Sequence, residues 1–219
     1  MKNFVDFYWN KRLEKCKKNL ENNNFIVHIA NSISNAEDIV INEILPQVKP
    51  KSASCGDSQT LHATNIISTI RQNPKIKLIE TFSKNVSMDI IEERRRQALL
   101  VDIFFTGSNA ITETGKLVNL DMECNRIAGI TFGPKNVIII IGRNKIVSDI
   151  DEAIKRIKNY AAPLNALRNS HFVNTPCNKT SYCIDCNSPD RICNAWLITE
   201  KSYPKNRIKI ILINEDVGL

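Results

Sequence analysis

The sequence lacks the long apolar segments that membranes and secretion require. No run of apolar residues approaches the roughly 18 that a helix needs to cross a bilayer. The opening residues, Met1–Asp6, contain no apolar core of a signal peptide. The sequence therefore predicts a soluble, cytoplasmic protein with no membrane span.

Aromatic residues are few, and the cysteines are odd in number. Seven cysteines in a reducing compartment do not predict a disulfide framework. Aromatic residues make up 6% of the chain and are not interleaved with the basic residues. Proteins that bind single-stranded nucleic acid stack its bases on aromatic side chains. A nucleic-acid-binding module is therefore the least favoured functional class.

The chain is basic, with 30 Lys and Arg against 23 Asp and Glu and a formal charge of +7. Its basic residues concentrate in segments 11–18 and 94–96, both within predicted helices. Charge on the outer face of a helix usually serves solubility. The same balance permits attraction to nucleic acid, an acidic membrane or a phosphorylated ligand, and a small anionic metabolite is the expected partner.

The length and composition predict one globular domain with an appendage. The chain has 219 residues, of which 42% are hydrophobic, which is enough to bury one substantial core. The predicted parts are a helical and α/β extension over 1–50, an α/β core over 51–170, and a cysteine-rich segment with C-terminal strands over 171–219.

The first third of the chain alternates helices with short strands. An apolar stripe from Val5 to Leu20 predicts an amphipathic helix that ends near residues 22–24. A strand is predicted at 25–29. Ser34 and Glu37 have the spacing of a capping box and predict a helix that continues to about Leu45.

The alternation continues beyond residue 50. Strands are predicted at 52–55, 77–80, 101–105 and 137–141, and helices at 58–71, from Ser87 and from Ser148. This order predicts a mainly parallel, doubly wound sheet flanked by helices. The last two apolar runs, 195–199 and 208–213, are predicted to form a hairpin.

A polar loop region follows the predicted strand at 101–105. In open α/β sheets, ligands bind beyond the carboxyl ends of the strands. The candidate ligand-binding residues are Gly107, Ser108, Asn109, Asn119, Asn125 and Arg126, and the candidate catalytic carboxylates are Glu113 and Asp121. The alternative is a structural hairpin rich in turn-forming residues.

Five segments in this order resemble one known family. They are Asp102–Asp121, Asn125–Arg126, Phe132–Lys135, Gly142–Ile146 and Ala161–Asn165. Together they closely resemble the LUD-domain (lactate-utilisation) family, and the likeness covers the chain from about residue 52 onward.

The resemblance implies a Rossmann-like, NagB/RpiA/CoA-transferase-like fold. It also implies a redox-linked subunit or accessory protein of lactate oxidation, with iron–sulfur partner subunits. A homo-oligomer is a further candidate assembly. A second hypothesis, from the fold, is a stand-alone enzyme acting on a CoA ester, nucleotide or sugar phosphate through Glu113.

The sequence departs from the family pattern at two loops. Cys55–Leu61 stands where a Gly-Gly-Ser segment is common, and Glu123 and Cys124 stand in a loop that commonly contains glycine. Glycine permits positive φ and close backbone approach. Glu123 and Cys124 are therefore expected to narrow the ligand cleft or to change what it accepts.

Four cysteines cluster near the C-terminus, at Cys177, Cys183, Cys186 and Cys193. The central pair has the C-x-x-C spacing that lets two sulfurs meet one ion. The segment predicts a zinc site or an iron–sulfur cluster, between which spacing does not decide. The alternatives are four unliganded cysteines or a redox dithiol.

Overall fold

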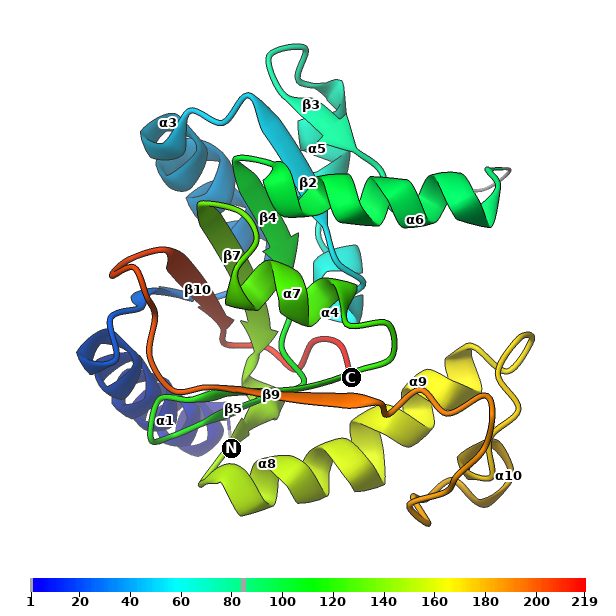
Figure 1. Cartoon of the computed structure of the whole chain (residues 1–219). Coiled ribbons are helices and arrows are strands. Elements are labelled where there is room, and N and C mark those ends of the chain that lie inside the picture. The colour runs from blue at the N-terminus through cyan, green and yellow to red at the C-terminus, as the bar shows by residue number, and fades with distance from the viewer. Residues whose placement is uncertain (1, 84–85) are drawn as a thin grey trace.

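A computed structural model describes residues 2–83 and 86–219. Its main element is a six-stranded parallel sheet in the order β1-β10-β7-β4-β2-β3 (Figure 1). The strands are β1 Ile26–Ala30, β2 Ser52–Cys55, β3 Lys77–Ile79, β4 Ile103–Thr106, β7 Asn136–Gly142 and β10 Ile208–Ile213. The predicted parallel, doubly wound α/β fold is confirmed.

The uninterrupted apolar sequence of β7 places it inside this sheet. Its residues Val137, Ile139 and Ile141 belong to one core cluster, and Ile138 and Ile140 belong to the other. A strand covered on both faces has no polar alternation.

Helices pack on both faces of the sheet. One face meets α1 (Lys2–Asn22) and α7 (Asn125–Thr131), and the other meets α2 to α5. These last helical segments are α2 Ile33–Asp38, the π-helical turn Ile39–Ile44, α3 Leu45–Val48, α4 Gln59–His62 and α5 Ile66–Gln72. Helix α6 (Met88–Gln97) precedes β4.

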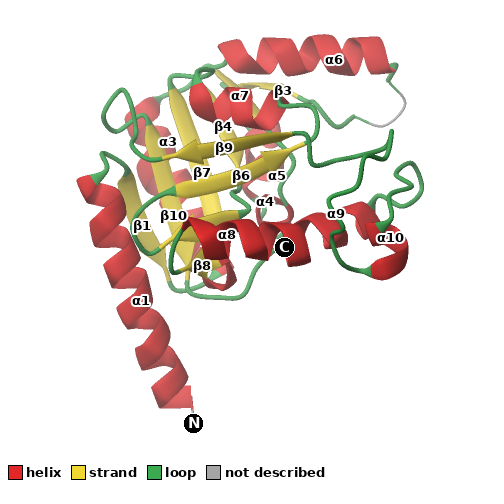
Figure 2. Ribbon diagram, turned by 60° about the horizontal axis from the view of Figure 1, so that its bottom comes forward, coloured by secondary structure: helices red, strands yellow, loops and turns green. Residues whose placement is uncertain are grey.

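A second, four-stranded sheet packs beside the first, in the order β8-β5-β6-β9. Its strands are β5 Ala110–Thr112, β6 Leu117–Asp121, β8 Ile146–Val147 and β9 Ala195–Thr199. Helix α8 (Ile150–Arg156), the π-helical turn Ile157–Ala161 and α9 (Ala162–Arg168) follow one another along this side of the molecule (Figure 2). The cysteine segment with α10 (Cys177–Thr180) lies beyond α9.

The predicted hairpin of 195–199 with 208–213 is wrong. β9 pairs antiparallel with β6, whereas β10 pairs in parallel with β1 and β7 in the other sheet. Every residue of β10 is buried, but side chains of β9 alternate between partly buried and exposed. A central strand and an edge strand have different surroundings, so the two runs separate despite their short connection.

Two helix starts differ from the predicted caps. The side chain of Ser32, not Ser34, accepts the amide of Asn35 at 3.2 Å and begins α2. At α8 the cap is Asp149, which accepts the amide of Glu152 at 2.9 Å. Ser, Thr, Asn and Asp cap almost equally well, so neighbouring candidates compete and packing decides between them.

The helix predicted over 58–71 is two helices. α4 ends at His62, and α5 begins at Ile66. The Glu37 side chain, expected in a capping box, instead accepts the backbone amide of Asn65 at 2.7 Å. Within the described residues, no helix is long and apolar enough to cross a membrane.

Candidate functional site

A cleft of about 450 Å³ opens beyond the carboxyl ends of β2 and β4. Its lining comes from the loops after β2, β4, β6 and β7 and from α9. The lining includes Asp57, Ser58, Gly107, Ser108, Asn109, Asp121, Glu123, Asn125, Arg126, Lys145, Asn165 and Arg168. This is the position where open α/β sheets bind ligands.

Gly107 lets the loop after β4 pass close to the start of α4. A Cβ at this position would lie 2.3 Å from the Ser58 hydroxyl oxygen. That hydroxyl accepts the amide of Leu61 at 3.2 Å and caps α4. Gly107 therefore serves close packing at the cleft floor.

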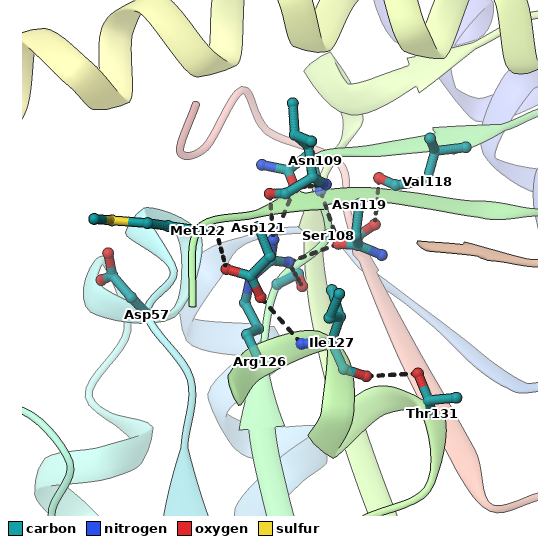
Figure 3. Close-up of polar contacts among 12 residues, drawn as sticks. Asp57, Ser108, Asn109, Val118, Asn119, Asp121, Met122, Arg126, Ile127 and Thr131 are labelled. Carbon is teal, nitrogen blue, oxygen red and sulfur yellow. Dashed lines mark hydrogen bonds and ion pairs between the residues drawn. The ribbon is translucent and has the colours of Figure 1, made fainter. Parts of the chain in front are cut away.

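Arg126 is a structural anchor beneath the cleft loops (Figure 3). Its guanidinium donates to the side-chain oxygens of Asn119 at 2.6 Å and Asn109 at 2.9 Å. It also donates to the backbone oxygens of Leu120 at 3.0 Å and Gly107 at 3.3 Å. The side chain is 8% exposed. These contacts occupy both terminal nitrogens, so the hypothesis that Arg126 itself grips an anion is not favoured.

Asp121 is engaged in the same network. One carboxylate oxygen lies 3.7 Å from the Arg126 Nε and accepts the amide of Ile127 at 3.1 Å. The other accepts the amide of Met122 at 3.0 Å. Asp121 lies on the cleft wall, and its contacts are those of a carboxylate that orders the turn before α7.

The remaining polar candidates differ in whether they bond to the protein's own backbone, lie buried away from the cleft or line it. The Ser108 hydroxyl donates to the backbone oxygen of Ala110 at 2.9 Å, inside the β5–β6 hairpin. Asn119 is fully buried and does not line the cleft. Asn125 is half-buried and lines it. Of the predicted ligand-binding residues, the structure brings all except Asn119 to the cleft.

Glu113 lies outside the cleft, in the turn between β5 and β6. Its two carboxylate oxygens contact Arg12 at 2.6 Å and Lys15 at 2.7 Å on α1. Burial opposes ionisation of Glu113, but the hydrogen bonds from Lys15 and Arg12 outweigh it and lower its pKa. This carboxylate fastens α1 to the second sheet, and nothing in its position suits the nucleophile or base predicted from sequence.

Sequence reasoning missed Lys145, which lines the cleft. It ends the 3₁₀ turn Arg143–Lys145 after β7 and is only 4% exposed. Within the described residues its amine makes no hydrogen bond or ion pair. Burial, then the charges of Arg156 and Arg126, lower its pKa to about 7. Gly142–Ile146 was recognised as a family-like segment, yet a single lysine in a sequence does not reveal burial.

Arg156 is a second cation behind this wall. It donates to the backbone oxygens of Asn109 at 2.8 Å and Asn144 at 3.2 Å. Within 2–83 and 86–219, no carboxylate pairs with it. Burial lowers its pKa. Lys145 and Arg156 therefore form a positive region whose charge the described residues leave uncompensated.

The charges at the cleft rim, by contrast, are paired. Asp57 contacts His62 at 2.9 Å and also pairs with Arg168. Burial opposes the ionisation of Asp57, but the His62 hydrogen bond and the Arg168 charge lower its pKa overall. Arg168 also donates to the Asn165 side chain at 2.7 Å.

Glu123 and Cys124, which depart from the family pattern, lie at the cleft and just before α7. Cys124 adopts a left-handed conformation, with φ of 66°, just before α7. Glycine takes such a conformation at no steric cost. Glu123 lines the cleft and pairs with Arg95. The expected narrowing of the cleft by Glu123 and Cys124 stays a prediction.

The four clustered cysteines, Cys177, Cys183, Cys186 and Cys193, surround one small cavity of about 20 Å³. Lys158 and Arg191 line the same cavity. The amide of Asp185 donates to the Cys183 sulfur at 3.3 Å. In the part of the chain that the structure describes, no three potential metal ligands are placed closely enough to hold an ion.

Comparison with known proteins places this architecture in a family. The LUD domain matches residues 13–213. No curated protein matches. The crystal structure of a DUF162 family protein from Deinococcus radiodurans, at 1.70 Å resolution, is similar with a TM-score of 0.51 and 11% identity, over 94% of this chain and 98% of that one. Its likeness supports the fold. A LUD domain implies, at the level of the family, a function related to lactate utilisation, and this chain belongs to the LUD domain family.

Proposed function

We propose that this protein binds a small organic anion in the cleft, as a redox-linked subunit or accessory protein of 2-hydroxy-acid oxidation. The observation that carries the proposal is the pair of buried basic side chains, Lys145 and Arg156, for which the described residues supply no carboxylate. Lactate and pyruvate are anions of the relevant class.

Electrostatics favours an anion at this place. Lys145 has lost much of its hydration, and the neighbouring charge of Arg156 further disfavours its charged form. A carboxylate beside Lys145 would supply the missing opposite charge. Arg126 and Asp121 would hold the surrounding loops in place through their mutual contacts. A preformed site of this kind loses little conformational freedom on binding.

The size of the cleft agrees with a small-molecule site. Its volume of about 450 Å³ falls within the range of about 300 to 1,000 Å³ that such sites occupy. Lys145 lies on the wall near the C-terminal residues, since a Cβ on Gly218 would lie 3.2 Å from its amine. Leu219 also lines the cleft. The chain's own last residues thus border the proposed binding position.

Thermal denaturation with chosen ligands tests the proposal. L-lactate and pyruvate are expected to raise the midpoint of unfolding, because a ligand that binds only the folded state stabilises it. Lactamide, which has the same size but no charge, is expected to leave the midpoint unchanged. Equal effects of lactate and lactamide, or no effect of either acid, would refute anion binding in this cleft.

The stand-alone enzyme hypothesis loses its proposed catalytic group. Glu113 is committed to Arg12 and Lys15 on the far side of the β5–β6 hairpin. A CoA ester, nucleotide or sugar phosphate also carries negative charge, so the binding assay should include inorganic phosphate. Stabilisation by phosphate alone would favour that alternative class of ligand.

We further propose that the cysteine segment holds a zinc ion or an iron–sulfur cluster. The four thiols surround one cavity, and the Asp185 amide would stabilise a Cys183 thiolate. Lys158 and Arg191 would offset the negative charge of several thiolates. The sulfurs would have to approach one another, which a short loop with few buried apolar residues can allow.

Metal analysis of anaerobically purified protein tests this second proposal. We expect stoichiometric zinc, or iron with visible absorption, in the wild-type protein. The double variant Cys183→Ser/Cys186→Ser should lose it, and Cys124→Ser, outside the segment, should retain it. A metal-free wild-type protein would refute the proposal. Iron–sulfur partner subunits, a homo-oligomer and a cytoplasmic location stay predictions.

A further inference from the structure

We infer that the amine of Lys145 is a nucleophile that forms an imine with a small 2-oxo acid bound in the cleft. The inference rests on the proposed anion-binding function, and it adds a ligand class and a covalent step. In this step Lys145 reacts with the ligand, beyond any contribution to its charge or packing.

The contacts of Lys145 leave its amine available. The side chain is almost fully buried, lines the cleft and has no hydrogen-bond partner among the described residues. Lys209 provides a contrast within the same protein. It is 8% exposed, but its amine donates to the Asn136 side chain at 2.9 Å and to the backbone oxygen of Asn206 at 3.2 Å. Burial alone therefore does not set Lys145 apart.

The surroundings of Lys145 favour a neutral amine near pH 7. Burial removes water from the ammonium form, and the positive charges of Arg156 and Arg126 disfavour it further. Lysines activated for imine formation lie in such desolvated sites, often beside another cation. A neutral nitrogen has the lone pair that attack on a carbonyl requires.

A 2-oxo acid matches both properties of this position. Its carboxylate would interact with the positive field of the guanidinium groups of Arg156 and Arg126. Its carbonyl carbon is directly bonded to that carboxylate and would lie within reach of the neighbouring amine. A 2-hydroxy acid has the same carboxylate but no carbonyl, so it would bind without reacting.

The step is balanced without an oxidant. The Lys145 nitrogen attacks the carbonyl carbon, the C=O electron pair moves to oxygen, and a proton passes from nitrogen to oxygen to give a carbinolamine. Protonation of that hydroxyl lets it leave as water while the nitrogen lone pair forms the C=N bond, and loss of the nitrogen proton returns the proton that was added. One amine and one carbonyl compound thus give one imine and one water.

Reductive trapping tests the inference on the full-length chain. The protein is incubated at neutral pH with pyruvate and cyanoborohydride, which reduces an imine to a stable secondary amine, and the adduct is located by peptide mapping. We expect modification at Lys145 to be at least about a hundredfold faster than at exposed lysines. At pH 7 the neutral fraction of an exposed lysine, with pKa near 10.4, is about a thousandfold smaller than that of Lys145, with pKa about 7. No adduct, or equal labelling of many lysines, would overturn the inference.

Control reactions keep the result interpretable. Lys145→Met should lose the fast pyruvate adduct, and Lys209→Met should form it as the wild-type protein does. L-lactate, which has no carbonyl, should label neither the wild-type protein nor the variants. Mapping in the wild-type chain decides the question even if Lys145→Met folds poorly. Thermal stabilisation by pyruvate without an adduct would refute the imine and leave the proposed function standing. Absence of both would refute both.

Discussion

The Arg126 guanidinium and the side-chain oxygen of Asn119 lie 2.6 Å apart beneath the cleft loops. This contact joins the start of α7 to the middle of β6. Arg126, a candidate anion ligand from the sequence, therefore holds the loops that line the cleft in shape.

Replacing Arg126 should damage the fold. Arg126→Met would leave several buried oxygens without a donor and would remove the positive charge beside the Asp121 carboxylate, so we expect a loss of about 3 kcal/mol of unfolding free energy. Urea denaturation measures it. Arg168→Met, at the more exposed rim, should cost less than about 1 kcal/mol. Equal, small losses for both would contradict the anchoring role of Arg126.

Glu113→Gln should affect stability and leave ligand binding unchanged. The lost contacts to Arg12 and Lys15 should cost about 1 kcal/mol. Because the folded-state pKa of Glu113 lies below its ordinary 4.5, its contribution is complete above that value and disappears as pH falls through the lowered pKa. Wild type and variant should therefore converge in acid. Glu14→Gln, on helix α1, is the control. Weaker pyruvate binding by Glu113→Gln would contradict the placement of Glu113 outside the cleft.

Cys124→Gly should stabilise the protein. The left-handed backbone at Cys124 costs a side chain of this kind about 1 kcal/mol, and glycine adopts it without strain. A gain of about 0.5 to 1 kcal/mol is expected by urea denaturation. Asn206 also has positive φ, of 68°, but asparagine tolerates it, so Asn206→Gly should change little. A destabilised Cys124→Gly variant would show that its side chain contributes more than the strain it causes.

Lys145→Met should make the free protein more stable, and the gain should depend on pH. The folded-state pKa of Lys145, about 7, lies below its ordinary 10.5, so the unfolded chain binds more protons between these values. Wild-type stability from this group consequently rises with pH across that window. The advantage of the variant should be largest at or below about pH 7 and small near pH 10. A difference independent of pH would show that the amine is not held neutral.

The parallel sheet could be predicted from the sequence because its strands are short, mostly apolar runs. The apolar run at 137–141 identifies a strand covered on both faces, and β7 lies inside the sheet as expected. The pairing of β9 could not be read in the same way. Its partner β6 lies more than seventy residues earlier, and a short connection to β10 suggested a hairpin. Local patterns do not encode which distant edge a strand meets.

The polar loops that the sequence placed near a cleft do line one, but the contacts of the residues within them could not be read from the sequence. Glu113 and Arg126 have reactive or charged groups in a polar loop, and sequence does not tell whether such groups are already paired. Lys145 could not be singled out from the sequence, because what distinguishes it is burial beside the cleft and the absence of a partner among the described residues. Both properties arise only after β7, α8 and the C-terminal segment have come together.

Calorimetric titration of pyruvate into the wild-type protein, Lys145→Met and Lys209→Met tests the anion site most directly. We expect saturable binding by wild type and Lys209→Met, and affinity at least about tenfold weaker in Lys145→Met, equivalent to about 1.4 kcal/mol. Equal affinity in all three proteins, or no binding by the wild type, would contradict the assignment of this cleft.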